Sequence, residues 1–215
     1  MTPAVVVRAA GALVEAAPLR QAALNEIVRV GPRQLLGEVI RLDGDCATVQ
    51  VFEETSGLAL DAPVLPTGAP LLAELGPGLL GSVLDGIGRP LELLARREGG
   101  FIGAGTTAPT LDRERRWAFA PSVAIGASVE AGDVLGSVEE REGITHRVMV
   151  PPGAAGMVTA IAAGEFTVED VIGQLEDGTA LRLAQHWPVR IPRPVKQWLP
   201  PSRPFMTGQR VFDFL

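Results

Sequence analysis

The sequence predicts a mainly β protein, and two observations lead to that fold class. The 215 residues are 47% hydrophobic and 20% charged, a balance typical of a globular chain that buries a core. The 25 glycines and 18 prolines are numerous for a helical protein, and they recur between short apolar runs. Such runs, separated by turn-forming residues, are typical of strands joined by tight turns. The length allows one large domain or two of ordinary size.

Two apolar runs, at residues 4–7 and 12–14, predict the first two strands on either side of Gly11. Residues 16–26 are rich in alanine, and a short helix and a strand are both possible there. The next element is a hairpin over residues 35–51, with Asp43-Gly44 at its turn. Glu38 is the one polar exception on its apolar face. The residues expected on that buried face are Leu36, Ile40, Leu42, Ala47, Val49 and Val51.

Two adjacent carboxylates, Glu53 and Glu54, follow the hairpin and precede Thr55-Ser56-Gly57. Neighbouring side chains of a strand point to opposite faces, so these carboxylates do not converge for acid/base chemistry. We expect a solvated strand end followed by a turn.

Residues 70–91 are the stretch around which the rest of the chain is organised. Gly76-Pro77-Gly78 predicts a tight turn, because glycine allows positive φ and proline fixes φ near the value that a turn needs. The apolar run at residues 79–84 is interpreted as a buried strand that leaves this turn. Asp85-Gly86 is a second turn signal, and it ends the run.

The second half of the chain follows a charged stretch that ends in two glycines, at residues 92–100, where we place a domain boundary. Residues 111–117 are a charge run, which in isolation is most often a solvated surface. Residues 123–138 and 148–161 are two similar glycine-punctuated units, and they predict a small compact barrel of hairpins. Further strands are expected at residues 167–172 and 180–183, around an Asp177-Gly178 turn. Three prolines in residues 187–194 impose extended backbone, with solvated arginines.

The residues that carry common chemistries are missing from the sequence. No phosphate-binding loop is present, because the only lysine, Lys196, lacks the glycines before it and the Ser or Thr after it. His146, His186 and Cys46 do not have metal-ligand spacing, and no Gly-x-Ser-x-Gly elbow or dinucleotide fingerprint occurs. We therefore expect no catalytic, nucleotide-binding or metal-binding residue in this chain.

The charge and cysteine content limit the partners and the compartment. The net charge is −6 without a basic cluster, which argues against nucleic-acid binding. A single cysteine cannot form an internal disulfide, which fits a reducing compartment. Neither a signal peptide nor a membrane span is recognisable. We expect a soluble, cytoplasmic protein without direct membrane insertion.

Five segments together resemble the A-type catalytic chain, or A subunit, of V-type and archaeal-type rotary ATPases. The first resembles that family's barrel motif, although Asp61 stands where the family usually has glycine. Asp tolerates left-handed backbone, so this turn can survive. The segments are Gln-Val-Phe-Glu-Glu-Thr-Ser-Gly-Leu at 50–58, Leu-Gly-Pro-Gly-Leu-Leu-Gly with Asp-Gly-Ile-Gly-Arg-Pro-Leu at 75–91, Leu-Asp-Arg-Glu-Arg-Arg-Trp at 111–117, Trp-Pro-Val-Arg-Ile-Pro-Arg-Pro at 187–194 and Thr-Gly-Gln-Arg-Val-Phe-Asp at 207–213.

This resemblance implies a division of the chain into four parts. Residues 1–72 would form an N-terminal, six-stranded type of β-barrel, and residues 73–98 a connector into a truncated nucleotide-binding domain. Residues 99–190 would form the inserted bulge domain, which is similar to a biotinyl/lipoyl-type barrel. A carrier role does not follow, because no lysine occurs in residues 1–195. Residues 191–215 would return the chain towards the phosphate-binding loop. The related B subunits and the F-type and flagellar-export subunits lack such an insert, which favours the A subunit.

The resemblance also implies a function for the complete subunit. It would alternate with B subunits and other A subunits in a hexameric ring, contact central and peripheral stalk subunits, and bind ATP or ADP with Mg²⁺. ATP synthesis or hydrolysis would be coupled to H⁺ or Na⁺ transport by a complex peripheral to the membrane. This chain alone would bind no cofactor and hydrolyse no ATP. It would supply the crown of the ring and the packing surfaces of the bulge.

The end of the sequence leads to two further expectations. Val211, Phe212, Phe214 and Leu215 would belong to a buried strand without its neighbours, so that trimming residues 205–215 should improve solubility. The alternative to an ATPase subunit is a non-catalytic scaffold or assembly protein, or a remnant, derived from the A subunit.

Overall fold

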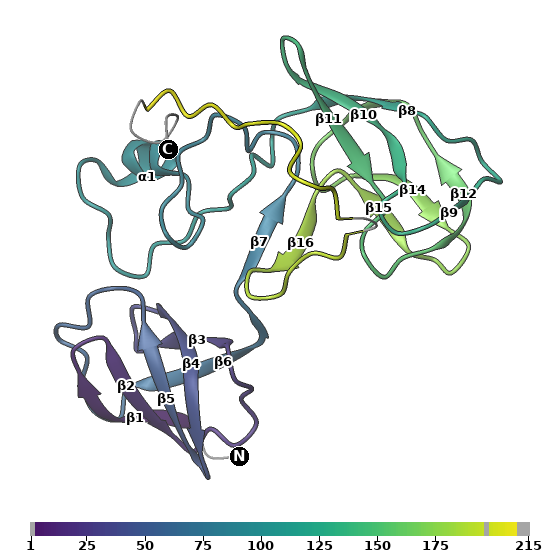
Figure 1. Ribbon diagram of the computed structural model, residues 1–215. Helices are drawn as coiled ribbons and strands as arrows, with labels where there is room; N and C mark the ends of the chain where they lie inside the picture. Colours follow the sequence, from purple (N-terminus) through teal and green to yellow (C-terminus); the bar gives the residue numbers. More distant parts are fainter. Residues whose placement is uncertain (1–2, 196–197, 210–215) are drawn as a thin grey trace.

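The computed structural model describes residues 3–195 and 198–209, and it confirms the mainly β fold class (Figure 1). A closed six-stranded barrel forms one end of the molecule, and a second β domain forms the other. A two-stranded ribbon runs between them (Figure 1). No helix among the described residues is long and apolar enough to span a bilayer.

The N-terminal barrel is antiparallel and closes in the order β1-β2-β5-β4-β3-β6. Alternate strand residues point inward, and Val6, Val14, Val28, Val39 and Val49 are each fully buried in its core. Branched residues suit this pleated, closed surface. The strands are β1 (Ala4–Ala10), β2 (Leu13–Ala17), β3 (Glu26–Val30), β4 (Leu35–Asp43), β5 (Cys46–Val51) and β6 (Pro63–Pro70).

The hairpin of β4 and β5 is confirmed, but its predicted buried face is wrong in β4. The register pairs Val39 with Val49, so Val39 and Leu35 point into the core. Ile40 and Leu42 lie on the outside, 38% and 42% exposed, and Leu36 is half-buried. Apolar residues occupy both faces of β4, so its alternation does not determine which face is buried. The pairing with β5 determines it.

The alanine-rich stretch forms no helix, because residues 18–25 make turns before β3 begins at Glu26. The turn at Asp61 does survive the loss of glycine, since its φ is +62°. The strands predicted at residues 4–7 and 12–14 correspond to β1 and β2.

Two segments before the second domain differ from the sequence-based expectation. Residues 79–84 form turns and one isolated bridge, from Leu84 to Pro90, rather than a buried strand. The charged stretch after Pro90 is a helix, α1 (Leu91–Glu98), which buries Leu94. Glu92 lies in its first turn and two arginines lie in its last, where they complement the helix dipole.

The second domain is a sandwich of two four-stranded sheets, ordered β11-β10-β8-β13 and β15-β14-β12-β9. Its core contains fully buried residues from both sheets, among them Val138 and Val158. Residues 167–170 form a turn, so the strand expected there begins only at Val171. The strands are β8 (Trp117–Pro121), β9 (Ser128–Val129), β10 (Val134–Arg141), β11 (Ile144–Met149), β12 (Gly156–Ile161), β13 (Gly164–Phe166), β14 (Val171–Leu175) and β15 (Ala180–Arg182).

The chain crosses between the two β domains twice, and the two crossings pair with each other. On the way out it forms β7 (Leu72–Leu75), and on the way back β16 (Gln185–Pro188). These strands form the antiparallel ribbon, in which Leu75 lies opposite Gln185 (Figure 1). The strand predicted at the end of the chain, residues 211–215, lies outside the described residues.

Candidate functional site

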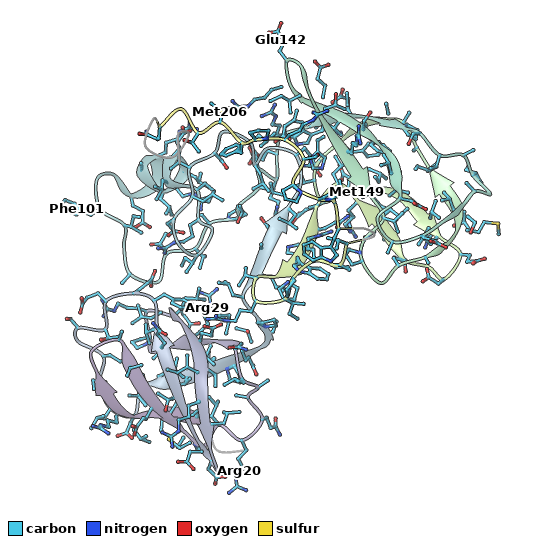
Figure 2. The ribbon with its side chains drawn as sticks, viewed as in Figure 1. Arg20, Arg29, Phe101, Glu142, Met149 and Met206 are labelled. Carbon is cyan, nitrogen blue, oxygen red and sulfur yellow. The ribbon has the colours of Figure 1, made fainter. Side chains whose placement is uncertain are left out.

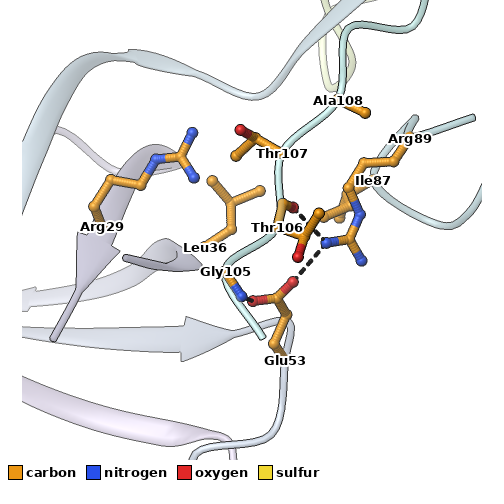
Figure 3. Close-up of a pocket in the computed structure, with 9 residues that line it drawn as sticks. All are labelled: Arg29, Leu36, Glu53, Ile87, Arg89, Gly105, Thr106, Thr107 and Ala108. Carbon is orange, nitrogen blue, oxygen red and sulfur yellow. Dashed lines mark hydrogen bonds and ion pairs between the residues drawn. The ribbon is translucent and has the colours of Figure 1, made fainter. Parts of the chain in front are cut away.

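Arg89 is the centre of a network that joins the end of the barrel to the segment after α1 (Figure 3). Its Nη1 donates to Glu53 Oε1 at 2.7 Å and to the Thr106 carbonyl at 2.8 Å, and its Nε donates to Asp85 Oδ2 at 2.7 Å. The second oxygen of Glu53 accepts the Gly105 N–H at 2.6 Å. The side chains of Arg89, Glu53 and Asp85 are only 12%, 10% and 17% exposed. The prediction of a solvated strand end is therefore wrong for Glu53, whereas Glu54 is exposed and the expected turn follows it.

Asp85 also organises its own turn, as its Oδ1 accepts the N–H groups of Ile87 at 3.1 Å and Arg89 at 2.8 Å. The turn predicted at Asp85-Gly86 is confirmed. Burial alone raises the pKa of Asp85, but these hydrogen bonds and the guanidinium charge outweigh it, so the pKa lies below its ordinary value.

A pocket of about 140 Å³ opens beside this network and is lined by Arg29, Leu36 and Thr107 on its other side (Figure 3). The carboxylate of Glu53 is held by one guanidinium and one backbone N–H, so it is committed to structure. Both of its oxygens are occupied, so neither is free to accept a proton from a bound molecule. The geometry is that of a structural joint between two parts of the chain.

The glycine-rich loop at residues 76–81 is hydrogen-bonded to Glu140 of the second domain. The Glu140 side chain is 3% exposed. Its Oε1 accepts the N–H groups of Gly78 at 2.7 Å and Leu80 at 3.1 Å. A side chain at Gly76 would lie 2.9 Å from Leu111 Cδ1, and one at Gly78 would lie 3.2 Å from the Trp117 ring. The glycines are therefore required for close approach of the loop to this domain.

Glu74, on the ribbon, is another carboxylate with little exposure, and its side chain is 12% exposed. It binds the guanidinium of Arg113, the N–H of Leu111 at 3.1 Å and His186 Nε2 at 3.3 Å. Burial raises the pKa of Glu74, but the hydrogen bonds from Arg113 and Leu111 outweigh it and the pKa is lowered. Arg113 also pairs with Glu169 at 2.7 Å. The interpretation of residues 111–117 as a solvated charge run is wrong for Arg113.

Glu38 of β4 is a further carboxylate with a cationic partner, and its side chain is 2% exposed. Arg190, in the turn after β16, binds both of its oxygens, with Nε 2.6 Å from Oε1 and Nη2 on Oε2. The hydrogen bonds and charge of Glu38 raise the pKa of Arg190. Arg190 was expected to be solvated, but it ties the turn after β16 to the barrel.

The remaining candidates lie apart from these joints. His146 is half-buried, 3.7 Å from Glu140, and burial lowers its pKa although Glu140 opposes this. Cys46 is a free thiol whose pKa is raised by burial. Among the described residues, no three His, Cys, Asp or Glu side chains gather in a metal-binding arrangement. Lys196 lies outside the described residues.

Two family models match the chain over its two β domains. Residues 6–68 match the β-barrel domain of the ATP synthase alpha/beta family, and residues 108–190 match the ATP synthase alpha/beta subunit barrel-sandwich domain. The chain therefore belongs to the ATP synthase alpha/beta family.

Within that family, the chain corresponds to the N-terminal region of V/A-type ATP synthase A (alpha) subunits. It is 55% identical over 207 residues to the V-type ATP synthase alpha chain of Anaeromyxobacter dehalogenans (strain 2CP-C), which covers 96% of this chain and 36% of that protein. It is 48% identical over 213 residues to the A subunit of the A-type ATP synthase of Pyrococcus abyssi, or 97% of this chain and 21% of that protein. The chain thus spans about a third or less of the length of these relatives.

Proposed function

We propose that these residues are the N-terminal part of a catalytic A subunit that, when complete, couples ATP synthesis or hydrolysis to H⁺ or Na⁺ transport. The observation that supports this most is that the similarity to the Anaeromyxobacter alpha chain covers 96% of this chain, and so includes the barrel, the connector and the inserted sandwich. The inserted domain distinguishes the A subunit from the non-catalytic B subunits and from the F-type subunits.

In this proposal the 215 residues provide structure rather than chemistry. The barrel packs in the crown of a hexameric ring with B subunits and other A subunits, and the sandwich faces the stalk subunits. ATP or ADP and Mg²⁺ bind elsewhere in the complete subunit, in a cytoplasmic complex peripheral to the membrane. We propose the division into residues 1–72, 73–98, 99–190 and 191–215 as the corresponding parts. The contacts of Glu53, Glu74, Glu140 and Glu38 support the first three parts, because they tie residues 1–72, 73–98 and 99–190 to one another.

A chimera tests this proposal. Residues 1–215 replace the aligned segment of the Anaeromyxobacter alpha chain, and the chimera is co-expressed with the other subunits of that enzyme. We expect an assembled complex that hydrolyses ATP at a rate within about fivefold of the parent, because a change of less than about 1 kcal/mol in the barrier alters the rate by about fivefold at most. A chimera that folds, but neither assembles nor hydrolyses ATP, contradicts the proposal and favours the scaffold alternative.

The purified chain alone should show no ATPase activity, since it contains no glycine-rich loop with a lysine that could reach the terminal phosphates. The measurement is phosphate release at several protein concentrations. Activity that rises in proportion to the concentration of chain, and that survives repurification, contradicts this expectation.

A further inference from the structure

Strand β11 is an edge strand of the sandwich, because β10 is its only neighbour among the described residues. Its pairing with β10 is regular on its own side, since both register shifts add the extra residue to β10. The Met149 carbonyl points away from β10 and accepts a hydrogen bond from the Gln185 side chain at 2.6 Å. Backbone groups of an antiparallel strand alternate in direction, so Arg147 and Thr145 present theirs on the same edge. This edge is available to a further strand.

A groove of about 170 Å³ lies between this edge and the ribbon. His146, Arg147 and Arg193 contribute the charged or titratable side chains to its lining, and no carboxylate does so. The nearby Glu140 is committed to the N–H groups of Gly78 and Leu80. The groove is therefore basic in a chain whose net charge is −6. Figure 2 shows Met149 on the side of the sandwich that faces the ribbon.

The guanidinium of Arg193, at this groove, has only part of its hydrogen-bonding capacity used. Its Nη2 donates to Gln185 Oε1 at 3.0 Å, and its guanidinium lies 5.1 Å from the centre of the Trp187 ring. Its Nη1 is buried and has no hydrogen-bond partner among the described residues. A buried donor without a partner is costly, and native structures usually provide one.

The Gln185 side chain makes the two contacts that a bound strand would make. Its amide N–H donates to Met149 as a strand N–H would, and its oxygen accepts from Arg193. A neutral amide offers the guanidinium a single oxygen, whereas a carboxylate offers two and binds such a fork bidentately. An acidic segment in place of Gln185 would satisfy both Nη1 and Nη2.

We propose that the β11 edge is a docking site for an extended acidic segment of a partner protein. The segment adds as a strand beside β11, donates to the Met149 carbonyl, and directs a carboxylate to Arg193, while Arg147 adds attraction along the edge. Gln185 closes the site when it is empty and swings out when the strand binds.

A fluorescent hexapeptide of alternating valine and glutamate tests the proposal on the full chain. All its glutamates share one face of the strand, so registers that differ by two residues all keep the carboxylates towards the groove. Fluorescence polarisation should show binding at least about tenfold tighter than that of the same peptide with glutamine for glutamate. Amide hydrogen exchange of Thr145 and Arg147 should slow when the peptide is bound.

Variants distinguish this site from general charge attraction. Arg193→Gln should weaken binding at least about tenfold, and Arg193→Lys, which keeps the charge but loses the fork, should weaken it as well. Gln185→Ala should tighten binding, because it removes the competing side chain. Arg203→Gln, an exposed arginine outside the groove, is the matched control and should change nothing.

Four results would overturn the proposal. These are no binding of either peptide, equal binding of both, weaker binding by Gln185→Ala, or unchanged exchange at β11 in the presence of bound peptide. Thermal unfolding of each variant shows whether it is folded. If Arg193→Gln is not folded, Arg193→Lys and Gln185→Ala decide between the outcomes, because they are expected to change the affinity in opposite directions.

Discussion

Replacement of Arg89 by methionine should destabilise the joint between the barrel and the segment after α1. The change removes the cation that pairs with Glu53 and Asp85, whose side chains are 10% and 17% exposed. Removal of one partner from a buried ion pair costs about 3–5 kcal/mol of the free energy of unfolding. These carboxylates are slightly exposed, so we expect a loss of about 3 kcal/mol. For a chain of this length, each 1 kcal/mol lowers Tm by about 2–4 °C, so Tm should fall by about 6–12 °C.

The assay combines calorimetry with hydrogen exchange at Gly105, whose N–H donates to Glu53. That amide should exchange faster in the Arg89→Met variant, because its acceptor is no longer held in place. The matched control is Arg96→Met, which removes a 3.6 Å pair with Glu92 on the exposed face of α1. Exposed helix pairs contribute about 0.3–0.5 kcal/mol. If both variants lose the same stability, or if Gly105 keeps its protection in Arg89→Met, Arg89 does not hold this joint.

Glu140→Gln keeps the side-chain size but removes the charge that two backbone N–H groups face, so urea denaturation should show a loss of about 1–3 kcal/mol. Gly76→Ala adds a methyl group 2.9 Å from its nearest neighbour and should cost about 1–3 kcal/mol, whereas Gly86→Ala, in open space, should stay within about 0.5 kcal/mol. Equal effects at the two glycines would contradict close packing of the loop. The folded-state pKa values of Asp85 and Glu74 lie below their ordinary values. The two carboxylates therefore stabilise the folded state fully at pH values above their unfolded pKa of about 4. This contribution is lost as the pH falls through their lower folded-state pKa values. Tm measured from neutral to acid pH should fall in that window, less steeply for Asp85→Asn, and an identical slope would exclude Asp85 as a contributor.

The local features of the fold could be predicted from the sequence where one residue type decides the backbone. Asp61 adopts the left-handed conformation that was expected to survive there, and Asp85-Gly86 forms the expected turn. In β5, Ala47, Val49 and Val51 point inward as their alternation with Thr48 and Gln50 indicated.

The buried face of a strand could not be predicted where both of its faces carry apolar residues. In β4 either set of alternate residues could form the core, and only the register with β5 decides between Leu36 and Leu35. The run at residues 79–84 has strand composition, but the N–H groups of Gly78 and Leu80 bind Glu140 instead of a neighbouring strand. Such a contact spans 60 residues or more of sequence, and no local rule anticipates it.

The joints were missed for the same reason. Glu38 and Arg190 are separated by 152 positions, and Glu53 and Arg89 by 36. One signal was present, because Glu38 is a single carboxylate within an apolar strand, and such a residue needs a partner when it is buried. The sequence indicated that a partner was needed, but it could not say which of the arginines would be the partner.

The ribbon of β7 and β16 has a consequence for engineering. Leu75 and Gln185 lie opposite each other, so the two ends of the segment 76–184 are close together in space. A unit with adjacent ends can be exchanged for another, or shortened to a tight turn, without rerouting the rest of the backbone. Residues 76–184 are therefore a unit with adjacent ends on a two-stranded stem, and an exchange of this unit has to replace the contacts that Arg89 and Gly105 make with Glu53 of the barrel.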